Sequence, residues 1–307
     1  MRDTFGRRVT SLRLSVTTGC DQRCFYCHHE GQSTSDAEMT AEEIRKLLEI
    51  ARAVEIKKLK ITGGEPLMRG DIVELVHTGA EIFDEVSMTT NGTLLASRAE
   101  DLKQAGLDRI NVSLDTLDPR LYEAITGADE IDSVIHGIDR AIEAGLRPLK
   151  INMVMLNGMN ISHLPQLLDF ASSKGAILQL IELSPVDGNG GDGLRGYFCP
   201  LGEIESSLAA CATRLERNEL HDRRRYTVPH NGSTVSVEIV RSVGRESFCM
   251  NCTRIRATSN GMLKPCLMTG DGMIDFLSPL RAGASDSELL ALFEEAIRKR
   301  RPYWVAK

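Results

Sequence analysis

Three cysteines stand close together near the start of the chain, spaced as Cys20-x3-Cys24-x2-Cys27. Cysteine thiolates are the usual ligands of iron–sulfur clusters, so three on one short loop suit a four-iron, four-sulfur (4Fe-4S) cluster. Three ligands for four irons leave one iron open to bind and reduce another molecule. A zinc site, with His28 or His29 as fourth ligand, is the alternative. We favour the cluster and interpret both histidines as ordinary loop residues.

A second cysteine group consists of Cys249-x2-Cys252 and, after thirteen intervening residues, Cys266. Alone, this group also fits a zinc ribbon, which needs a fourth ligand. Residues 253–258 have the pattern of a strand and Asn260-Gly261 is a strong hairpin turn, so we expect a hairpin that carries Cys266 back toward the other two cysteines.

Two arginines lie beside this second group. Arg254 and Arg256 are two residues apart, so in a strand both side chains point to the same face, next to the metal. Fixed guanidinium forks there suit a phosphate-rich or purine ligand. A solvated basic strand is the alternative.

Two further motifs contain turn-forming residues. In Gly63-Gly64-Glu65-Pro66, the glycines let the backbone approach a ligand closely and the proline favours an extended Glu65. A plain tight turn is the alternative. Thr89-Thr90-Asn91-Gly92 fits a turn and a ligand contact equally well, because a turn can also present Thr89.

The elements that must position these motifs alternate between apolar runs and amphipathic stretches. The predicted strands are Leu12–Val16, Lys58–Ile61, Glu85–Met88, Arg109–Leu114, Leu149–Met155 and Ile177–Leu183. The predicted helices start at Thr40, which with Glu43 forms a capping box, and continue at 71–82, 97–104, 133–144 and 162–173. Strands interleaved with helices predict an α/β fold, which we interpret as a partial six-stranded (β/α) TIM-like barrel. A flat doubly wound sheet is the alternative.

In such folds, ligands bind at the carboxyl ends of the strands. The cysteine loop follows the first predicted strand, and the Gly-Gly-Glu-Pro and Thr-Thr-Asn-Gly motifs follow the second and third. Ser113-Leu114-Asp115 closes the fourth, and Lys150 lies near the start of the fifth. The chemistry should therefore gather on one rim.

After Leu183 the pattern changes. Five glycines fall between residues 188 and 196, which predicts a flexible connector or lid. We therefore expect a barrel over residues 1–185, a connector over 186–200, and a small C-terminal α+β domain over 201–307 that carries the second cysteine group; the family resemblance described below implies that this group holds a second Fe-S cluster. It should contain a helix at 201–210, a strand at 234–240 and a final helix at 285–300 capped by Ser285 and Glu288.

Composition limits the class of protein. The 307 residues carry 37 Lys and Arg against 43 Asp and Glu, a net charge of −6, so no overall basic field favours nucleic acid or an anionic membrane. The N-terminus has no apolar signal-like segment, so we expect a cytoplasmic protein. In a cytoplasmic protein, cysteines are more often metal ligands than partners in disulfides. Cys199 and Cys211 fall outside both groups and are expected to be free thiols.

The first cysteine loop, with Tyr26 just before its third cysteine, resembles the radical S-adenosylmethionine (SAM) superfamily. The approach Leu12–Thr17 and the block Cys-x2-Cys-x-Arg-x-Arg with Cys266 resemble, more narrowly, the MoaA family of GTP 3',8-cyclases, lyases that begin molybdenum cofactor biosynthesis. The resemblance runs from about Val9 to Trp304.

The resemblance implies two 4Fe-4S clusters, and it assigns individual residues. The cluster ligands would be Cys20, Cys24 and Cys27, and Cys249, Cys252 and Cys266. The SAM-contacting positions would be Tyr26, Gly64 and Ser113, with Ser184 where the family usually has Met. The GTP-binding positions would be Arg13, Lys60, Thr89, Lys150, Arg254 and Arg256.

By the same resemblance, one electron cleaves SAM, the resulting 5'-deoxyadenosyl radical takes the ribose 3' hydrogen of GTP, and the carbon radical closes on C8 of guanine. The implied partners are a reductant protein and the downstream cyclic pyranopterin monophosphate synthase, and a homodimer is left open. The family commonly ends in a Gly-Gly tail that serves cyclisation, whereas this chain ends Trp304-Val305-Ala306-Lys307. Another element is then expected to do that work, or the reaction differs.

Two alternatives come from other classes. A radical SAM maturase acting on a peptide would usually carry more cysteines in its C-terminal domain and would not need the Arg-x-Arg pair. A non-enzymatic Fe-S or zinc module would not need the Gly-Gly-Glu-Pro motif or the barrel.

Overall fold

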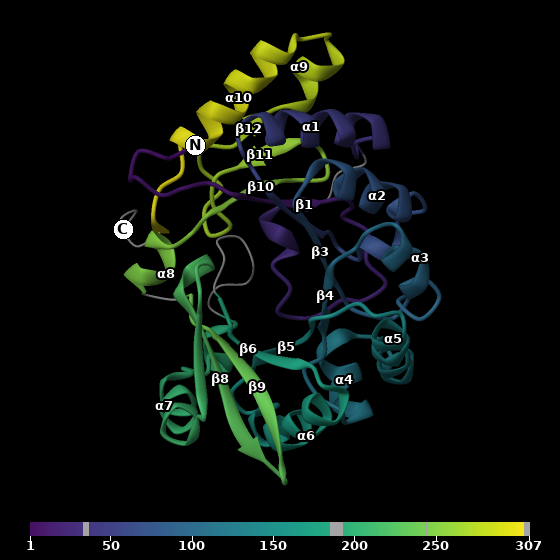
Figure 1. The fold of residues 1–307 in the computed structure, drawn as a ribbon, viewed down its shortest axis with the longest axis vertical. Coiled ribbons are helices and arrows are strands. Elements are labelled where there is room, and N and C mark those ends of the chain that lie inside the picture. The colour runs from purple at the N-terminus through teal and green to yellow at the C-terminus, as the bar shows by residue number, and fades with distance from the viewer. Residues whose placement is uncertain (33–36, 185–192, 243–244, 304–307) are drawn as a thin grey trace.

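The computed structural model of the chain describes residues 1–32, 37–184, 193–242 and 245–303. Six parallel strands form the centre of a curved sheet in chain order (Figure 1). They are β1 (Ser11–Ser15), β2 (Lys58–Thr62), β3 (Glu85–Thr90), β4 (Arg109–Ser113), β5 (Leu149–Met155) and β6 (Ile177–Glu182). All six predicted strands are confirmed to within two residues at each end.

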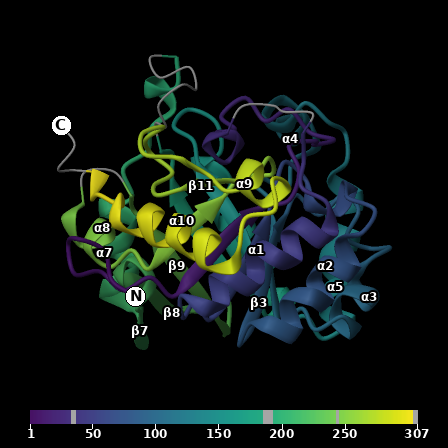
Figure 2. The same ribbon diagram turned by 90° about the horizontal axis from the view of Figure 1, so that it is seen from above.

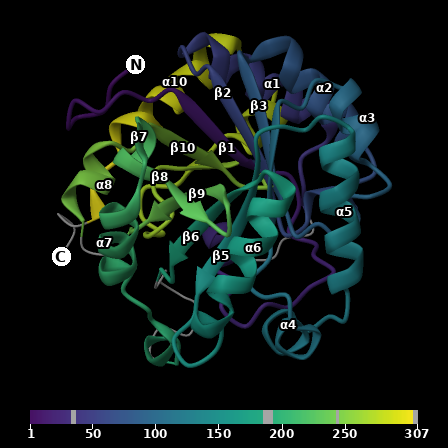
Figure 3. The ribbon, with the colours of Figure 1, turned by 60° about the horizontal axis from the view of Figure 1, so that its bottom comes forward.

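The helices that connect these strands cover the outer, convex side of the sheet, as Figure 3 shows for α1, α2, α3 and α5. They are α1 (Ala41–Ala53), α2 (Ile72–Ile82), α3 (Ala99–Gln104), α4 (Pro119–Thr126), α5 (Ile131–Glu143) and α6 (Leu164–Lys174). The capping box of Thr40 and Glu43 is present at the start of α1. The sequence analysis did not predict α4.

The C-terminal part of the chain extends this sheet at both edges. Its elements are α7 (Gly202–Cys211), β7 (Arg214–Asn218), β8 (Arg223–His230), β9 (Ser233–Val240), α8 (Glu246–Met250), β10 (Arg254–Ala257), β11 (Met262–Lys264), β12 (Ile274–Asp275), α9 (Leu277–Arg281) and α10 (Asp286–Arg298). Strand β9 pairs in parallel with β6, and β10 pairs in parallel with β1. The result is one sheet in the order β12-β11-β10-β1-β2-β3-β4-β5-β6-β9-β8-β7.

The predicted hairpin after Cys252 is confirmed, because β10 and β11 pair antiparallel on either side of Gly261. The final helix α10 keeps its capping box of Ser285 and Glu288 and lies alongside α1 (Figure 2). Its apolar stripe is packed, with Leu289 and Phe293 fully buried. The two domain boundaries stay a prediction, and residues 186–192 of the expected connector lie outside the described residues.

The sheet separates an apolar outer side from a polar inner side. On β1, Leu12 and Leu14 are buried against the helices while Arg13, between them, faces inward. Strand alternation produces this division, because successive side chains point to opposite faces. Among the described residues, no helix is long and apolar enough to cross a membrane.

Candidate active site

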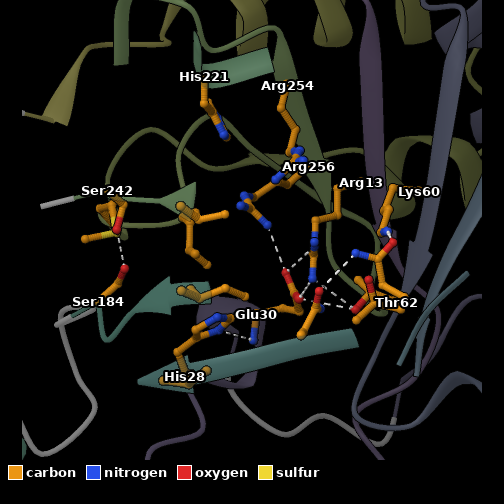
Figure 4. Close-up of a pocket in the computed structure, with 18 of the residues that line it drawn as sticks. Arg13, His28, Glu30, Lys60, Thr62, Ser184, His221, Ser242, Arg254 and Arg256 are labelled. Atoms are coloured by element: carbon orange, nitrogen blue, oxygen red, sulfur yellow. Dashed lines mark hydrogen bonds and ion pairs between the residues drawn. The ribbon is translucent and has the colours of Figure 1, made fainter. Parts of the chain in front are cut away.

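One cavity of about 380 Å³ lies on the inner side of the sheet, and both cysteine groups line it. Cys20, Cys24 and Cys27 come from the loop after β1. The second group consists of Cys249 in α8, Cys252 just after α8 and Cys266 just after β11. The cavity thus joins two groups that are more than two hundred residues apart in sequence. Figure 4 shows part of its wall.

The first cysteine loop is held by backbone contacts that only glycine permits. A Cβ atom on Gly64 would lie 2.1 Å from the carbonyl oxygen of Gly19. Gly64 N donates to Thr17 O at 2.8 Å, and Glu65 N donates to Gly19 O at 2.7 Å. The Gly-Gly pair therefore brings the loop after β2 directly against the cysteine loop, in addition to lining the cavity.

Glu65 is extended, as Pro66 predicts, and fully buried. Its carboxylate accepts hydrogen bonds from Thr90 Oγ1 and Asn91 N, both at 2.7 Å, and from Leu67 N at 2.9 Å. Burial raises its pKa to about 7 against the effect of these bonds. Glu65 thus fastens the turn after β3 to the loop after β2.

The predicted SAM-contacting residues all line the cavity: Tyr26, Gly64, Ser113 and Ser184. Tyr26 Oη donates to a carboxylate oxygen of Asp115, which also accepts from Val154 N at 2.7 Å. Burial raises the pKa of Asp115 to about 6. The sequence analysis noted Asp115 only as the end of a strand. The Ser184 hydroxyl is hydrogen-bonded to Ser242.

The thiols of the first group are unfavourable places for negative charge without a bound cation. Burial, followed by nearby acidic groups, raises the pKa of Cys20 to about 11, and burial raises those of Cys24 and Cys27. A positively charged iron centre would offset both effects, so the donor set fits an iron–sulfur cluster. Within the described ranges, no three His, Cys, Asp or Glu side chains are placed to hold a single metal ion.

The predicted GTP-binding residues divide into two groups. Arg13, Lys60, Thr89, Arg254 and Arg256 line the cavity. Lys150 does not line it; its ammonium pairs with Glu238 at 2.5 Å, and its side chain is 7% exposed. Strand register brings three residues of the first group together, because Arg13 lies directly opposite Lys60 on one side and Arg256 on the other.

The cations of this wall differ in their partners. Lys60 Nζ donates to Asn111 Oδ1 at 2.8 Å. Arg13 and Arg256 both pair with Glu30. Across the described part of the chain, the Arg254 guanidinium has neither a hydrogen bond nor an ion pair, and burial and the neighbouring arginines hold its pKa well below its usual range. Arg254 is therefore the cation with the greatest need of an anion.

Several cavity residues were missed or given no role from sequence: His28, Glu30, His221 and Arg223. His28 Nδ1 accepts from Glu30 N at 3.1 Å, and His221 stacks on Phe248. No local pattern could have marked His221, which lies in the turn before β8 with φ 64°. Cys199 is buried and Cys211 is exposed, and their being free thiols stays a prediction.

A curved parallel sheet whose first loop presents Cys-x3-Cys-x2-Cys beside a Gly-Gly-Glu-Pro turn defines the class of radical SAM enzymes. The family profile "Radical SAM superfamily" matches residues 14–171, and "Molybdenum Cofactor Synthesis C" matches residues 176–306. Membership of the superfamily brings with it the use of SAM and of an iron–sulfur cluster.

Sequence relatives show to which family of radical SAM enzymes the chain belongs. A protein of Pyrococcus abyssi named "Probable GTP 3',8-cyclase" is 47% identical over 98% of this chain and 99% of its own length. One of Methanocaldococcus jannaschii with the same name is 43% identical over the full length of both. The chain belongs to the GTP 3',8-cyclase family.

Solved structures show the same fold at low identity. Streptococcus suis SuiB bound to S-adenosylmethionine has a TM-score of 0.68 at 18% identity, over 96% of this chain and 68% of SuiB. SuiB bound to its precursor peptide SuiA has a TM-score of 0.65 at 18% identity, over 85% of this chain and 60% of that chain.

Proposed function

We propose that this protein is a GTP 3',8-cyclase that converts GTP to (8S)-3',8-cyclo-7,8-dihydroguanosine 5'-triphosphate, the first step of molybdenum cofactor biosynthesis. The observation that carries the proposal is the shared cavity: both cysteine groups and Arg254 line it. The name of the full-length relatives supports this activity over a peptide maturase or a non-enzymatic module.

Cys20, Cys24 and Cys27 would hold the cluster that, with SAM, supplies a 5'-deoxyadenosyl radical able to abstract hydrogen. The chain itself orients SAM. Tyr26, Gly64, Ser113 and Ser184 provide the surface around it, and Gly63 and Gly64 line the cavity beside the cysteine loop, where the methionine moiety would approach the cluster. The hydrogen bond from Tyr26 to Asp115 fixes the tyrosine ring beside the third cysteine.

The opposite wall would bind GTP. The nucleotide carries about four negative charges, and charge-assisted hydrogen bonds to guanidinium groups are the strongest available to a phosphate. Arg13, Lys60, Arg254 and Arg256 surround the space, with Thr89 as a hydrogen-bonding side chain. Lys150 lies behind this wall and shares Glu238 with Arg223, and of these three residues only Arg223 lines the cavity.

Cys249, Cys252 and Cys266 would hold a second 4Fe-4S cluster against which the guanine docks. The pKa of Cys252 is lowered by Arg300, by the backbone N–H of Arg254 and by further arginines nearby, although burial opposes this. A thiolate is the form that binds iron, so these cations favour ligation. The chain's task is to hold SAM and GTP in contact and to exclude water.

Further partners follow from the reaction. The proposed partners are a reductant protein that supplies the electron and a cyclic pyranopterin monophosphate synthase that consumes the product. We place both steps in the cytoplasm. We also include among the proposals that this protein forms a homodimer.

The test is a product analysis under exclusion of oxygen. The purified protein is reconstituted with iron and sulfide, incubated with SAM, dithionite and GTP, and its products are identified by mass. We expect 5'-deoxyadenosine together with a cyclised nucleotide that has the same mass as GTP, because the hydrogen taken from C3' is balanced by the electron and proton added after closure on C8. Chromatography before the mass measurement separates this isomer from GTP. Formation of 5'-deoxyadenosine with GTP unchanged would refute the cyclase assignment while leaving the radical SAM class intact. ATP in place of GTP is the control and should give no cyclised product.

A further inference from the structure

Glu30 lies inside the cationic wall, where an external anion is expected to bind. Its carboxylate accepts from Arg13 Nε at 2.9 Å and from Arg13 Nη2, and from Arg256 Nη1 at 2.8 Å (Figure 4). Thr62 Oγ1 donates to it as well, at 3.2 Å. The Glu30 side chain is 10% exposed. Four donors leave this carboxylate saturated, so it lies where an external anion would meet the same arginines.

The backbone that carries Glu30 is strained. His29, Glu30 and Gly31 have φ values of 46°, 54° and 65°, three successive residues in the left-handed region, of which only the glycine adopts it readily. Such strain persists only where surrounding contacts compensate for it. Here the compensating contacts are the two arginine pairs, together with the Lys264 ammonium, which donates to Gly31 O.

The two arginines that hold Glu30 are also those assigned to the phosphates of GTP. Arg13 uses Nε and Nη2 on Glu30, which is the same pair of atoms that forms a fork with a phosphate. One guanidinium edge cannot serve both anions. Arg254, two residues from Arg256 on the same face of β10, remains open for the first phosphate contact.

On these contacts, and resting on the proposed function, we infer that Glu30 is an internal counter-anion that the phosphate chain of the nucleotide displaces from Arg13 and Arg256. Glu30 neutralises the wall while no substrate is present. It also sets a threshold for binding, because a ligand must carry enough charge to replace a carboxylate that makes four hydrogen bonds. Glu30 thereby selects a triphosphate over weaker anions, and it is a specificity-determining residue.

The test measures affinity. Reconstituted wild-type protein and the variant Glu30→Gln are titrated anaerobically with GTP and with inorganic triphosphate by isothermal titration calorimetry. Removal of the competing charge should lower the dissociation constants of both ligands about ten- to a hundredfold. This range corresponds to the energy of one hydrogen bond to a charged group, which the ligand no longer has to displace. Glu30→Asp is too short to reach both arginines and should give a smaller increase, which keeps the test decisive if Glu30→Gln folds poorly.

The matched control is Glu43→Gln. Glu43 binds Arg281 through both carboxylate oxygens, at 2.6 and 3.1 Å, but does not line the cavity. Its replacement should leave both affinities unchanged. Weaker or equal binding of inorganic triphosphate and GTP by the Glu30 variants would show that Glu30 only positions the arginines, and the inference would be wrong. If wild-type protein binds inorganic triphosphate but not GTP, the proposed function fails, and the triphosphate titration still decides the role of Glu30.

Discussion

Arg254 and Arg256 provide a sharp comparison, because they lie two residues apart on β10 and face the same cavity but differ in their partners. Arg256 donates to Glu30 at 2.8 Å. Arg254 has no hydrogen bond or ion pair within the residues that the structure describes, and Arg256, Arg13 and Arg223 surround it with like charge. Replacing each by alanine should therefore separate ligand affinity from stability.

For Arg254→Ala we expect the dissociation constant for GTP to rise about ten- to a hundredfold, since a hydrogen bond to a charged group contributes about 1.5–3 kcal/mol. The free energy of unfolding should stay the same or increase, because the change removes a partly buried cation whose charged neighbours are mainly other arginines. For Arg256→Ala we expect a similar loss of affinity, together with a loss of about 1–3 kcal/mol of stability, because buried Glu30 loses one of its donors.

The assays are calorimetric titration with GTP and denaturant unfolding of the anaerobically purified variants, with iron content measured for each. Arg281→Ala, which removes the exposed partner of Glu43, is the control and should change neither affinity nor iron content. GTP affinity that stays at the wild-type value in Arg254→Ala would refute the assignment of this residue. Equal losses of stability in the two variants would refute the distinction between paired and unpaired arginine.

Three further predictions concern the clusters and the loops that hold them. Cys266→Ser should lower anaerobically determined iron from about eight to about four per chain, since each 4Fe-4S cluster holds four irons; an unchanged count would exclude Cys266 as a ligand. Gly64→Ala should disrupt the first cysteine loop and lower both iron content and melting temperature, because its Cβ would lie 2.1 Å from Gly19 O, whereas Gly70→Ala, with nothing within 4 Å, should do neither. Burial raises the pKa of Glu65 from 4.5 to about 7, so the folded protein binds a proton there that the unfolded chain releases, and this contribution to stability should be lost as pH rises from about 4.5 to about 7. In unfolding measurements on SAM-free protein, Glu65→Gln should remove that part of the pH dependence, and an unaltered slope would contradict it.

The strands and most helices of the barrel could be predicted because their signals are local. Alternation of apolar residues within five to seven positions defines a strand such as β5, and a capping box such as that of α1 marks a helix start. The β7–β8 hairpin gave no such signal. Its first strand, Arg214–Asn218, lies at the edge of the sheet and is largely exposed, so no alternating apolar face was needed there.

For the site, the sequence alone determined the chemistry: which thiols are spaced for a cluster, which arginines share a face, and where glycine is required. Only the tertiary structure decided how these pieces meet. Pairing of β10 with β1 sets Arg256 beside Arg13, and pairing of β9 with β6 brings Glu238 within reach of Lys150. The insertion of Glu30 between two arginines also became visible only in the fold. The physical reason is that a ligand group is encoded by residue type and short spacing, whereas register between strands hundreds of residues apart depends on how the whole sheet closes.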